Sequence, residues 1–306
     1  MGFVVGIDLG GTKTLGGIAT IDGSIVAEHT VATTQAAGQL PAQLISLIEA
    51  LASRAGIDRE AVAATGIGGA GVPDQHSGGF SMAPNLMLSG DRPLHDELTR
   101  ALGHPIVLEN DVNVAALGEL HEGVGRVAAD FVFISIGTGV GMGIVADGRL
   151  LRGAHGAAGE IGYLPVGTDP LDPAHQRRGP LEEQLAGDAL VARYRAASGA
   201  ALTAPDIFSR AVQGDPHASA AIDEHARWVA TAIVAVNAVL DPGIVVLGGG
   251  VGARPELLGP VRTWLAALGA SSVDVRISEL GSQAPVIGAV HLALDAVRLD
   301  PKGSSL

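Results

Sequence analysis

The sequence contains no cysteine, and aromatic residues make up only 3% of its 306 residues. Without thiols the chain forms neither disulfide bonds nor thiolate metal sites, and it has no cysteine nucleophile. Because aromatic side chains are scarce, we expect a core of Ala, Val, Leu and Ile. With 44 glycines, 47% hydrophobic residues and no low-complexity segment, this composition is typical of a soluble α/β protein.

Basic residues are also few, since 19 Lys and Arg stand against 32 Asp and Glu, for a formal net charge of −13. Such a chain is not expected to bind nucleic acid, because phosphate backbones need a basic surface. The most apolar helical stretch, 229–240, is too short to span a bilayer. The start, MGFVVGIDLGG, lacks the basic and apolar regions of a signal peptide. We therefore expect a cytoplasmic protein with no membrane partner.

Apolar runs that end at glycine turns organise the chain. The segment ISIGTGVGMGIVA echoes the earlier IDLGGTKTLGGIA, which predicts a duplicated core with one copy in each of two domains. We place the first domain at 1–118, with a C-terminal helix at about 287–300, and the second at 119–286. Hydrophobic periodicity predicts strands at 3–8, 13–21, 24–31, 62–67, 106–109, 131–136, 142–145 and 244–247, and helices at 40–55, 111–120, 226–240 and 287–297.

Three glycine turns each follow an apolar strand directly. Glycine lets a phosphate group approach backbone N–H donors closely, although any one such turn also fits a plain change of chain direction. The first turn adds the Asp8 carboxylate, which can hold Mg²⁺ through water. Together the turns predict a nucleotide site made of Asp8, Gly10, Gly11, Thr12, Lys13, Gly137, Thr138, Gly139, Gly249 and Gly250.

Polar residues 109–111, Glu-Asn-Asp, stand where a strand ends and a helix begins. Asn and Asp commonly cap the free N–H groups of a helix start. Alternatively, Asp111 is a general base beside a bound hydroxyl. From the local sequence alone, capping is the favoured interpretation.

The order and spacing of these motifs resemble those of the ROK family of sugar kinases, within the actin/Hsp70/hexokinase superfamily. The resemblance runs nearly end to end through IDLGGTKT, APNL at 83–86, ENDVNVAALGE at 109–119, ISIGTGVGMGIV, GAAGEIG at 156–162 and DPGIVVLGGGV at 241–251. It implies an α/β, two-domain actin-like ATPase (ribonuclease H-like) fold with a cleft between the domains. ATP, Mg²⁺ and a sugar would meet there, in an enzyme expected to be a homodimer.

The same resemblance assigns roles to single residues. Asp111 falls on the family's catalytic base, which reverses the capping interpretation. It would accept the proton of the attacking sugar hydroxyl, expected to be the primary (6-) one, as in a glucokinase. The family positions that bind the sugar are matched by Asn110, Glu160 and Glu182, with Gly69 and Asn85 in segments that line the same pocket. His121 is interpreted as a surface residue.

One loop departs from the family, most of whose members bind structural zinc through a His and three Cys. The matching positions are Tyr163, Pro173, His175 and Pro180, and zinc needs four N or S ligands, so no zinc site is expected. Prolines, and Arg177 or Arg178 paired with carboxylates, would hold the loop instead. Tyr163 stands where the zinc-bound His touches the sugar, and it either contacts the substrate or only fills space.

Alternatives follow from these departures. Because of Tyr163, an amino sugar or a cyclitol is an alternative to glucose. Polyphosphate is an alternative donor, with the pair Arg177–Arg178 as slender support. A sugar-responsive transcription regulator is disfavoured, since such family members carry a helix-turn-helix segment before the glycine motif and only seven residues precede Asp8 here.

Overall fold

A computed structural model describes residues 2–74, 79–81 and 93–299 of the chain. Two compact units emerge: unit 1 contains Met1–Gly123, Gly153–Ala157 and Ser282–Leu306, and unit 2 contains Val124–Arg152 and Ala158–Gly281. Whether these units are the predicted domains, with a cleft between them, stays a prediction. In the part of the chain that the structure describes, no helix is long and apolar enough to cross a membrane.

Unit 1 is built on a five-stranded sheet in the order β3-β2-β1-β4-β7. The consecutive strands β1, β2 and β3 pair antiparallel with their neighbours, whereas β1, β4 and β7 are parallel to one another. A tight turn at Gly23, with φ of +94°, joins β2 to β3, and an Asp-Gly pair such as Asp22–Gly23 is typical of such a turn. The bounds are β1 Phe3–Leu9, β2 Lys13–Thr20, β3 Ile25–Ala32, β4 Val62–Gly69 and β7 Ile106–Asn110, with a separate hairpin of β5 Val72–Asp74 and β6 Gly79–Ser81.

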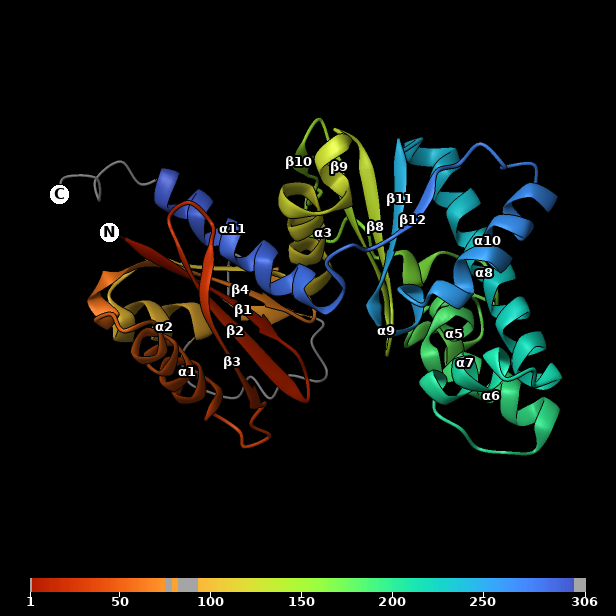
Figure 1. Cartoon of the computed structure of the whole chain (residues 1–306), viewed down its shortest axis with the longest axis horizontal. Helices are drawn as coiled ribbons and strands as arrows, with labels where there is room; N and C mark the ends of the chain where they lie inside the picture. Colours follow the sequence, from red (N-terminus) through yellow and green to blue (C-terminus); the bar gives the residue numbers. More distant parts are fainter. Residues whose placement is uncertain (1, 75–78, 82–92, 300–306) are drawn as a thin grey trace. The chain divides into compact units, whose positions relative to one another are not determined.

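Helices cover both faces of this sheet (Figure 1). On one face, α1 and α2 pack against alternate residues of β1 such as Val5 and Ile7. On the other, α11 packs against Val4 and its first half contacts α3. The bounds are α1 Leu40–Ala55, α2 Leu94–Leu102, α3 Asp111–Glu122 and α11 Ala284–Leu299.

The alternation of side chains along β1 determines which way its last polar residue points. A Cβ on Gly6 would lie 2.5 Å from the backbone nitrogen of Val290, so Gly6 faces α11 at close range. Asp8 comes two residues later and therefore projects from the same face as Gly6. That face also carries α3, whose first residue is Asp111.

A pair of histidines lies where α3 meets α11. The rings of His121 and His291 stack with their centroids 4.0 Å apart, and burial lowers the pKa of each. The interpretation of His121 as a plain surface residue is therefore wrong. The cause is α11, which comes far later in the sequence and covers this side of α3.

Unit 2 repeats the sheet of unit 1. Its strand order is β10-β9-β8-β11-β12, again with three sequential antiparallel strands followed by two parallel ones. The duplicated core predicted from the two glycine motifs is thus confirmed. The bounds are β8 Phe131–Ile136, β9 Val140–Ala146, β10 Arg149–Leu150, β11 Ile244–Gly248 and β12 Val275–Ile277.

The core of unit 2 forms where helices pack on this sheet, with α8 as the longest element. The apolar pattern predicts that α8 begins at residue 226, but it begins at Pro216, because Asp215 accepts hydrogen bonds from the N–H groups of His217 and Ala218. The helices are α4 Pro173–Gln176, α5 Glu182–Leu185, α6 Gly187–Ser198, α7 Ala204–Val212, α8 Pro216–Leu240, α9 Gly249–Gly252 and α10 Pro255–Ala267; short 3₁₀ turns cover Arg59–Ala61, Val124–Val127, Ile161–Tyr163 and Gly281–Gln283.

Candidate active site

Four predicted site residues of unit 1 meet at one edge of its sheet. Across the parallel strands β1, β4 and β7, Leu9 pairs in register with Gly69, and Gly69 with Asn110. Asp8 lies one residue before this row, and Asp111 follows it directly. In α/β folds, ligands bind outside the carboxyl ends of parallel strands, which is where this row ends.

Asn110 caps the helix that begins at Asp111. Its Oδ1 accepts hydrogen bonds from the N–H groups of Val112 at 2.9 Å and Asn113 at 3.2 Å. Its Nδ2 donates to the carbonyl oxygen of Gly71 at 3.0 Å. Asp111 accepts one backbone hydrogen bond, from Val112 N–H at 2.9 Å. The cap is therefore provided mainly by Asn110, and the general-base interpretation of Asp111 does not compete with it.

The carboxyl groups of Asp8 and Asp111 are electrostatically strained. Burial, followed by the charge of Asp111, raises the pKa of Asp8 to about 6, against a lowering by Lys13. Burial also raises the pKa of Asp111, although the N–H of Val112 opposes the shift. Two partly buried carboxylates favour a cation beside them, so this pair fits a hydrated divalent ion. Within the described ranges, no group of three His, Asp or Glu side chains could itself enclose a metal ion.

Residues outside the predicted set brace the first glycine turn. Thr33 Oγ1 donates to the carbonyl oxygen of Gly10 at 2.6 Å, and Gln35 Nε2 donates to that of Gly11 at 2.8 Å. Gly10 N–H itself bonds to Lys13 O at 3.1 Å, while Thr12 and Lys13 are exposed. Sequence reasoning missed Thr33 and Gln35, because they follow β3 and carry no motif of their own.

The second and third glycine turns adjoin each other in unit 2. Gly137 follows β8 and Gly249 follows β11, two parallel neighbours in the sheet. Gly249 has φ of +79°, and a Cβ there would lie 2.5 Å from the carbonyl oxygen of Ile136. By contrast, apart from the adjoining residues and the backbone of α9, no described atom lies within 4 Å of the position that a Cβ on Gly250 would take. The backbone at Gly250 is open to an approaching group, which fits a nucleotide.

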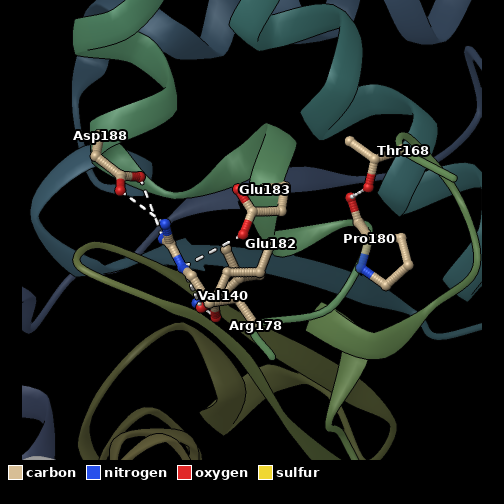
Figure 2. A network of polar contacts seen from close by, with 7 residues as sticks. All are labelled: Val140, Thr168, Arg178, Pro180, Glu182, Glu183 and Asp188. Atoms are coloured by element: carbon tan, nitrogen blue, oxygen red, sulfur yellow. Dashed lines mark hydrogen bonds and ion pairs between the residues drawn. The ribbon is translucent and has the colours of Figure 1, made fainter. Parts of the chain in front are cut away.

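Glu182 reaches the second glycine turn. Its Oε2 accepts the N–H of Val140, the first residue of β9, at 2.8 Å, and its Oε1 accepts from Arg178 Nε at 3.2 Å (Figure 2). The carboxylate fits there because Gly139 and Gly162 have no side chains; Cβ atoms on them would lie 3.1 and 3.3 Å from Glu182 atoms.

Two other predicted sugar-binding residues of unit 2, Glu160 and Tyr163, lie at either end of a short turn whose Gly162 lies against Glu182. Glu160 immediately precedes the 3₁₀ turn Ile161–Tyr163, and the N–H of Leu181 bonds to the carbonyl oxygen of Gly162 at 3.1 Å. Tyr163 is 44% exposed, so solvent or a ligand can reach its side chain. Asn85 lies outside the described residues.

Internal hydrogen bonds and ion pairs close the loop between Tyr163 and Pro180. Thr168 Oγ1 donates to Pro180 O at 3.3 Å (Figure 2), and His175 Nδ1 lies 3.1 Å from Asp169 O. Of the two arginines predicted to pair with carboxylates, Arg178 does so, with Glu182 and with Asp188. That zinc plays no part here stays a prediction.

Comparison with known proteins gives matches over nearly the whole chain. The sequence profile of the ROK family matches residues 4–296. The glucokinase of Streptomyces coelicolor is 33% identical over 316 residues, which cover 96% of this chain and 98% of that protein. The N-acetylmannosamine kinase of Escherichia coli O157:H7 is 36% identical over 298 residues, which cover 94% and 97%. A solved ROK family glucokinase from Streptomyces griseus, in complex with glucose and AMPPNP, aligns with a TM-score of 0.80 at 29% identity, covering 96% and 100%.

Proposed function

The chain belongs to the ROK family, and from this we propose that it transfers the γ-phosphoryl group of ATP to the primary (6-) hydroxyl of a hexose. It is a sugar kinase with the actin-like ATPase fold that the sequence predicts. The single observation that carries the proposal is the position of Asp111. This partly buried carboxylate starts α3 at the carboxyl ends of β1, β4 and β7, with Asn110 as the cap beside it.

Asp111 is proposed as the general base. A carboxylate whose pKa is raised by burial is a stronger base than an exposed one. It would accept the proton of the attacking hydroxyl as the new O–P bond forms and the bond to the leaving ADP breaks. Because phosphoryl transfer depends mostly on positioning and charge neutralisation, one well-placed base is sufficient.

The glycine turns are proposed to hold ATP. The first turn, with Gly10, Gly11, Thr12 and Lys13, and the second, 137–139, would bind phosphates through backbone N–H and hydroxyl groups. Gly249 and Gly250 would admit the adenosine, since the backbone at Gly250 is open. Mg²⁺ held through water by Asp8 would neutralise phosphate charge when bound.

The sugar is proposed to be bound by Gly69, Asn85, Asn110, Glu160, Tyr163 and Glu182. An N-acetylated amino sugar is the second candidate substrate, because an N-acetylmannosamine kinase is as similar to this chain as a glucokinase is. Tyr163 is the residue that could distinguish them, as its exposed phenol can donate or accept a hydrogen bond.

A coupled assay of ADP release, run with glucose, mannose, N-acetylmannosamine and glucosamine, tests the proposal. We expect glucose or mannose to give a higher kcat/KM than the two amino sugars, and product analysis to place the phosphate on O6. Polyphosphate in place of ATP should give less turnover. Turnover confined to N-acetylmannosamine would shift the assignment to the second candidate, and no turnover with any of the four would overturn both. The homodimer also stays a proposal, which light scattering of the purified protein tests.

A further inference from the structure

Arg178 lies in the loop between Tyr163 and Pro180 and contacts carboxylates on two sides. Its terminal nitrogens donate to Asp188, Nη1 to Oδ2 at 2.8 Å and Nη2 to Oδ1 at 3.2 Å. Its Nε donates to Glu182 Oε1 at 3.2 Å, with Glu183 Oε1 further away at 3.9 Å. Figure 2 shows the guanidinium between Asp188 and the pair Glu182 and Glu183.

The geometry of this guanidinium is one that lysine cannot reproduce. A planar fork engages the Asp188 carboxylate with two parallel hydrogen bonds, which fix the plane and leave Nε directed at Glu182. The hydrogen bond from Arg178 lowers the pKa of Asp188, so this carboxylate remains ionised well below neutral pH. Asp188 lies in the first turn of α6, where a negative charge is favourable.

The contacts then close a ring through the second glycine turn. Glu182 Oε2 accepts the N–H of Val140, which follows the turn 137–139. On the other side, the N–H of Gly187 donates to Gly137 O at 2.8 Å, and Gly187 is the neighbour of Asp188. The start of α6 therefore holds the turn directly through Gly187 and indirectly through Asp188, Arg178 and Glu182.

Both oxygens of Glu182 are thus oriented by the protein. Each carboxylate oxygen has two lone-pair directions; the Val140 N–H occupies one on Oε2, and the Arg178 Nε–H occupies one on Oε1. The remaining directions are free of these two donors and can accept sugar hydroxyls. If the ring were opened at Arg178, the long Glu182 side chain could rotate, and sugar binding would have to reorder it.

We propose that Arg178 is a positioning residue for substrate binding, which holds the Glu182 carboxylate in its sugar-binding orientation and ties it to the second glycine turn. The inference rests on the proposed role of Glu182 in sugar binding. According to this proposal, the ion pairs of Arg178 close the loop between Tyr163 and Pro180, for which the sequence offers no recognisable set of zinc ligands.

Arg178→Met, with Arg177→Met as the matched control, tests this inference. Arg177 is the adjacent arginine, is exposed and has no ion pair among the described residues, so both variants lose one positive charge in the same loop. We expect Arg178→Met to raise the hexose KM by roughly 5- to 20-fold while kcat changes less than about 3-fold, because one partly exposed charged hydrogen bond to Glu182 is lost. Arg177→Met should leave both constants within about 2-fold.

Amide hydrogen exchange of the ligand-free protein provides a readout that needs no substrate. Exchange at the Val140 amide should become faster in Arg178→Met, while a strand amide remote from the ring, such as Val5, stays unchanged. A merely structural role would lower the unfolding temperature and leave KM and Val140 exchange as they are. That outcome overturns the proposal.

Arg178→Lys and Asp188→Asn keep the test decisive if Arg178→Met fails to fold. Lysine can pair with one carboxylate at a time, so we expect Arg178→Lys to raise KM, but by less than Arg178→Met does. Asp188→Asn should raise KM in the same direction, and the double variant with Arg178→Met should be no worse than Arg178→Met alone. Additive effects, or a wild-type KM in both single variants, would contradict the ring. If the wild-type protein phosphorylates no hexose, the proposed function fails, while Val140 exchange still reports on the ring by itself.

Discussion

Asp8 and Asp111 share one buried electrostatic environment: burial first, and the charge of Asp111 second, raise the pKa of the Asp8 carboxyl group to about 6. The two residues come from the end of β1 and the start of α3, on the same face of the unit 1 sheet. Such a pair is unfavourable in the ligand-free protein and becomes favourable when a cation lies beside it. Removal of the Asp8 charge should therefore raise the stability of the ligand-free protein and lower the activity of the enzyme.

The first prediction concerns the stability of Asp8→Asn. The folded pKa of about 6 lies above the usual value of an exposed Asp, about 4, so the folded state binds a proton more tightly. Relative stability is thus greatest below about pH 4 and is lost as the pH rises through about 6. Removing this buried charge should stabilise the ligand-free protein by about 2–3 kcal/mol at pH 7.5, and by little at pH 4. Calorimetry at both pH values measures this, and an equal loss of stability at both would contradict it.

The second prediction is an acid limb in the pH profile of the wild-type enzyme. Protonation of Asp8, whose pKa is about 6, would weaken cation binding, so kcat/KM should fall as the pH drops through about 6, and not near 4. Protonation of Asp111, whose pKa is also raised, would remove the base and act in the same direction. Initial rates at limiting hexose between pH 5 and 8 measure it. A profile that is flat down to pH 5 would argue against ionised carboxylates in this site.

The third prediction separates two adjacent glycines. Gly250→Ala places its Cβ where no described atom lies, so the unfolding temperature should stay within a few degrees while the KM for ATP rises about 10-fold from obstructed nucleotide approach. Gly249→Ala puts a Cβ at positive φ and against Ile136 O, so it should destabilise by about 1–3 kcal/mol or more. Thermal unfolding and ATP titration measure both. Equal effects of the two substitutions would weaken the nucleotide assignment.

The fourth prediction uses the scarcity of lysine, since Lys13 and Lys302 are the only two in the chain. Lys13 is exposed at the start of β2 and would approach the phosphates of ATP. We expect ATP with Mg²⁺ to protect Lys13 from acetylation, whereas Lys302, which has no proposed role, is acetylated at the same rate with and without nucleotide. Peptide mass spectrometry measures acetylation at both sites. If nucleotide does not protect Lys13, Lys13 is not one of the nucleotide-binding residues.

Much of the fold was predictable because its signals are local. Apolar runs that stop at glycine predict the strands of both sheets, and Leu44, Leu47, Ile48 and Leu51 predict α1, which ends at Gly56 with φ of +69°. The helices α6 and α7 were not predicted. Only Leu190 and Tyr194 of α6 are buried, so its apolar pattern is weak and packing against α8 supports it. The signal of α7 is local but was missed: Thr203 and Asp206 form a capping box, and Pro205 stands in the first turn.

The site divides in the same way. Asp8, Gly69 and Asn110 come together because parallel strands end at one edge, a consequence of topology that the family motifs already imply. The bracing by Thr33 and the stacking of His121 on His291 depend on segments distant in sequence. The choice of Arg178 over Arg177 depends on which of the two side chains faces Glu182 and Asp188 once the loop is folded. No periodicity or spacing in one sequence specifies such contacts.

The measurement that tests the central claim most directly is the kcat of Asp111→Asn with ATP and the best hexose. The substitution keeps the shape of the side chain and removes a buried charge, so the fold should be at least as stable as the wild type. If Asp111 is the general base, kcat falls by about 10²- to 10⁴-fold, while the KM for ATP stays within a few fold. A kcat near that of the wild type, in a folded variant, would contradict the mechanism.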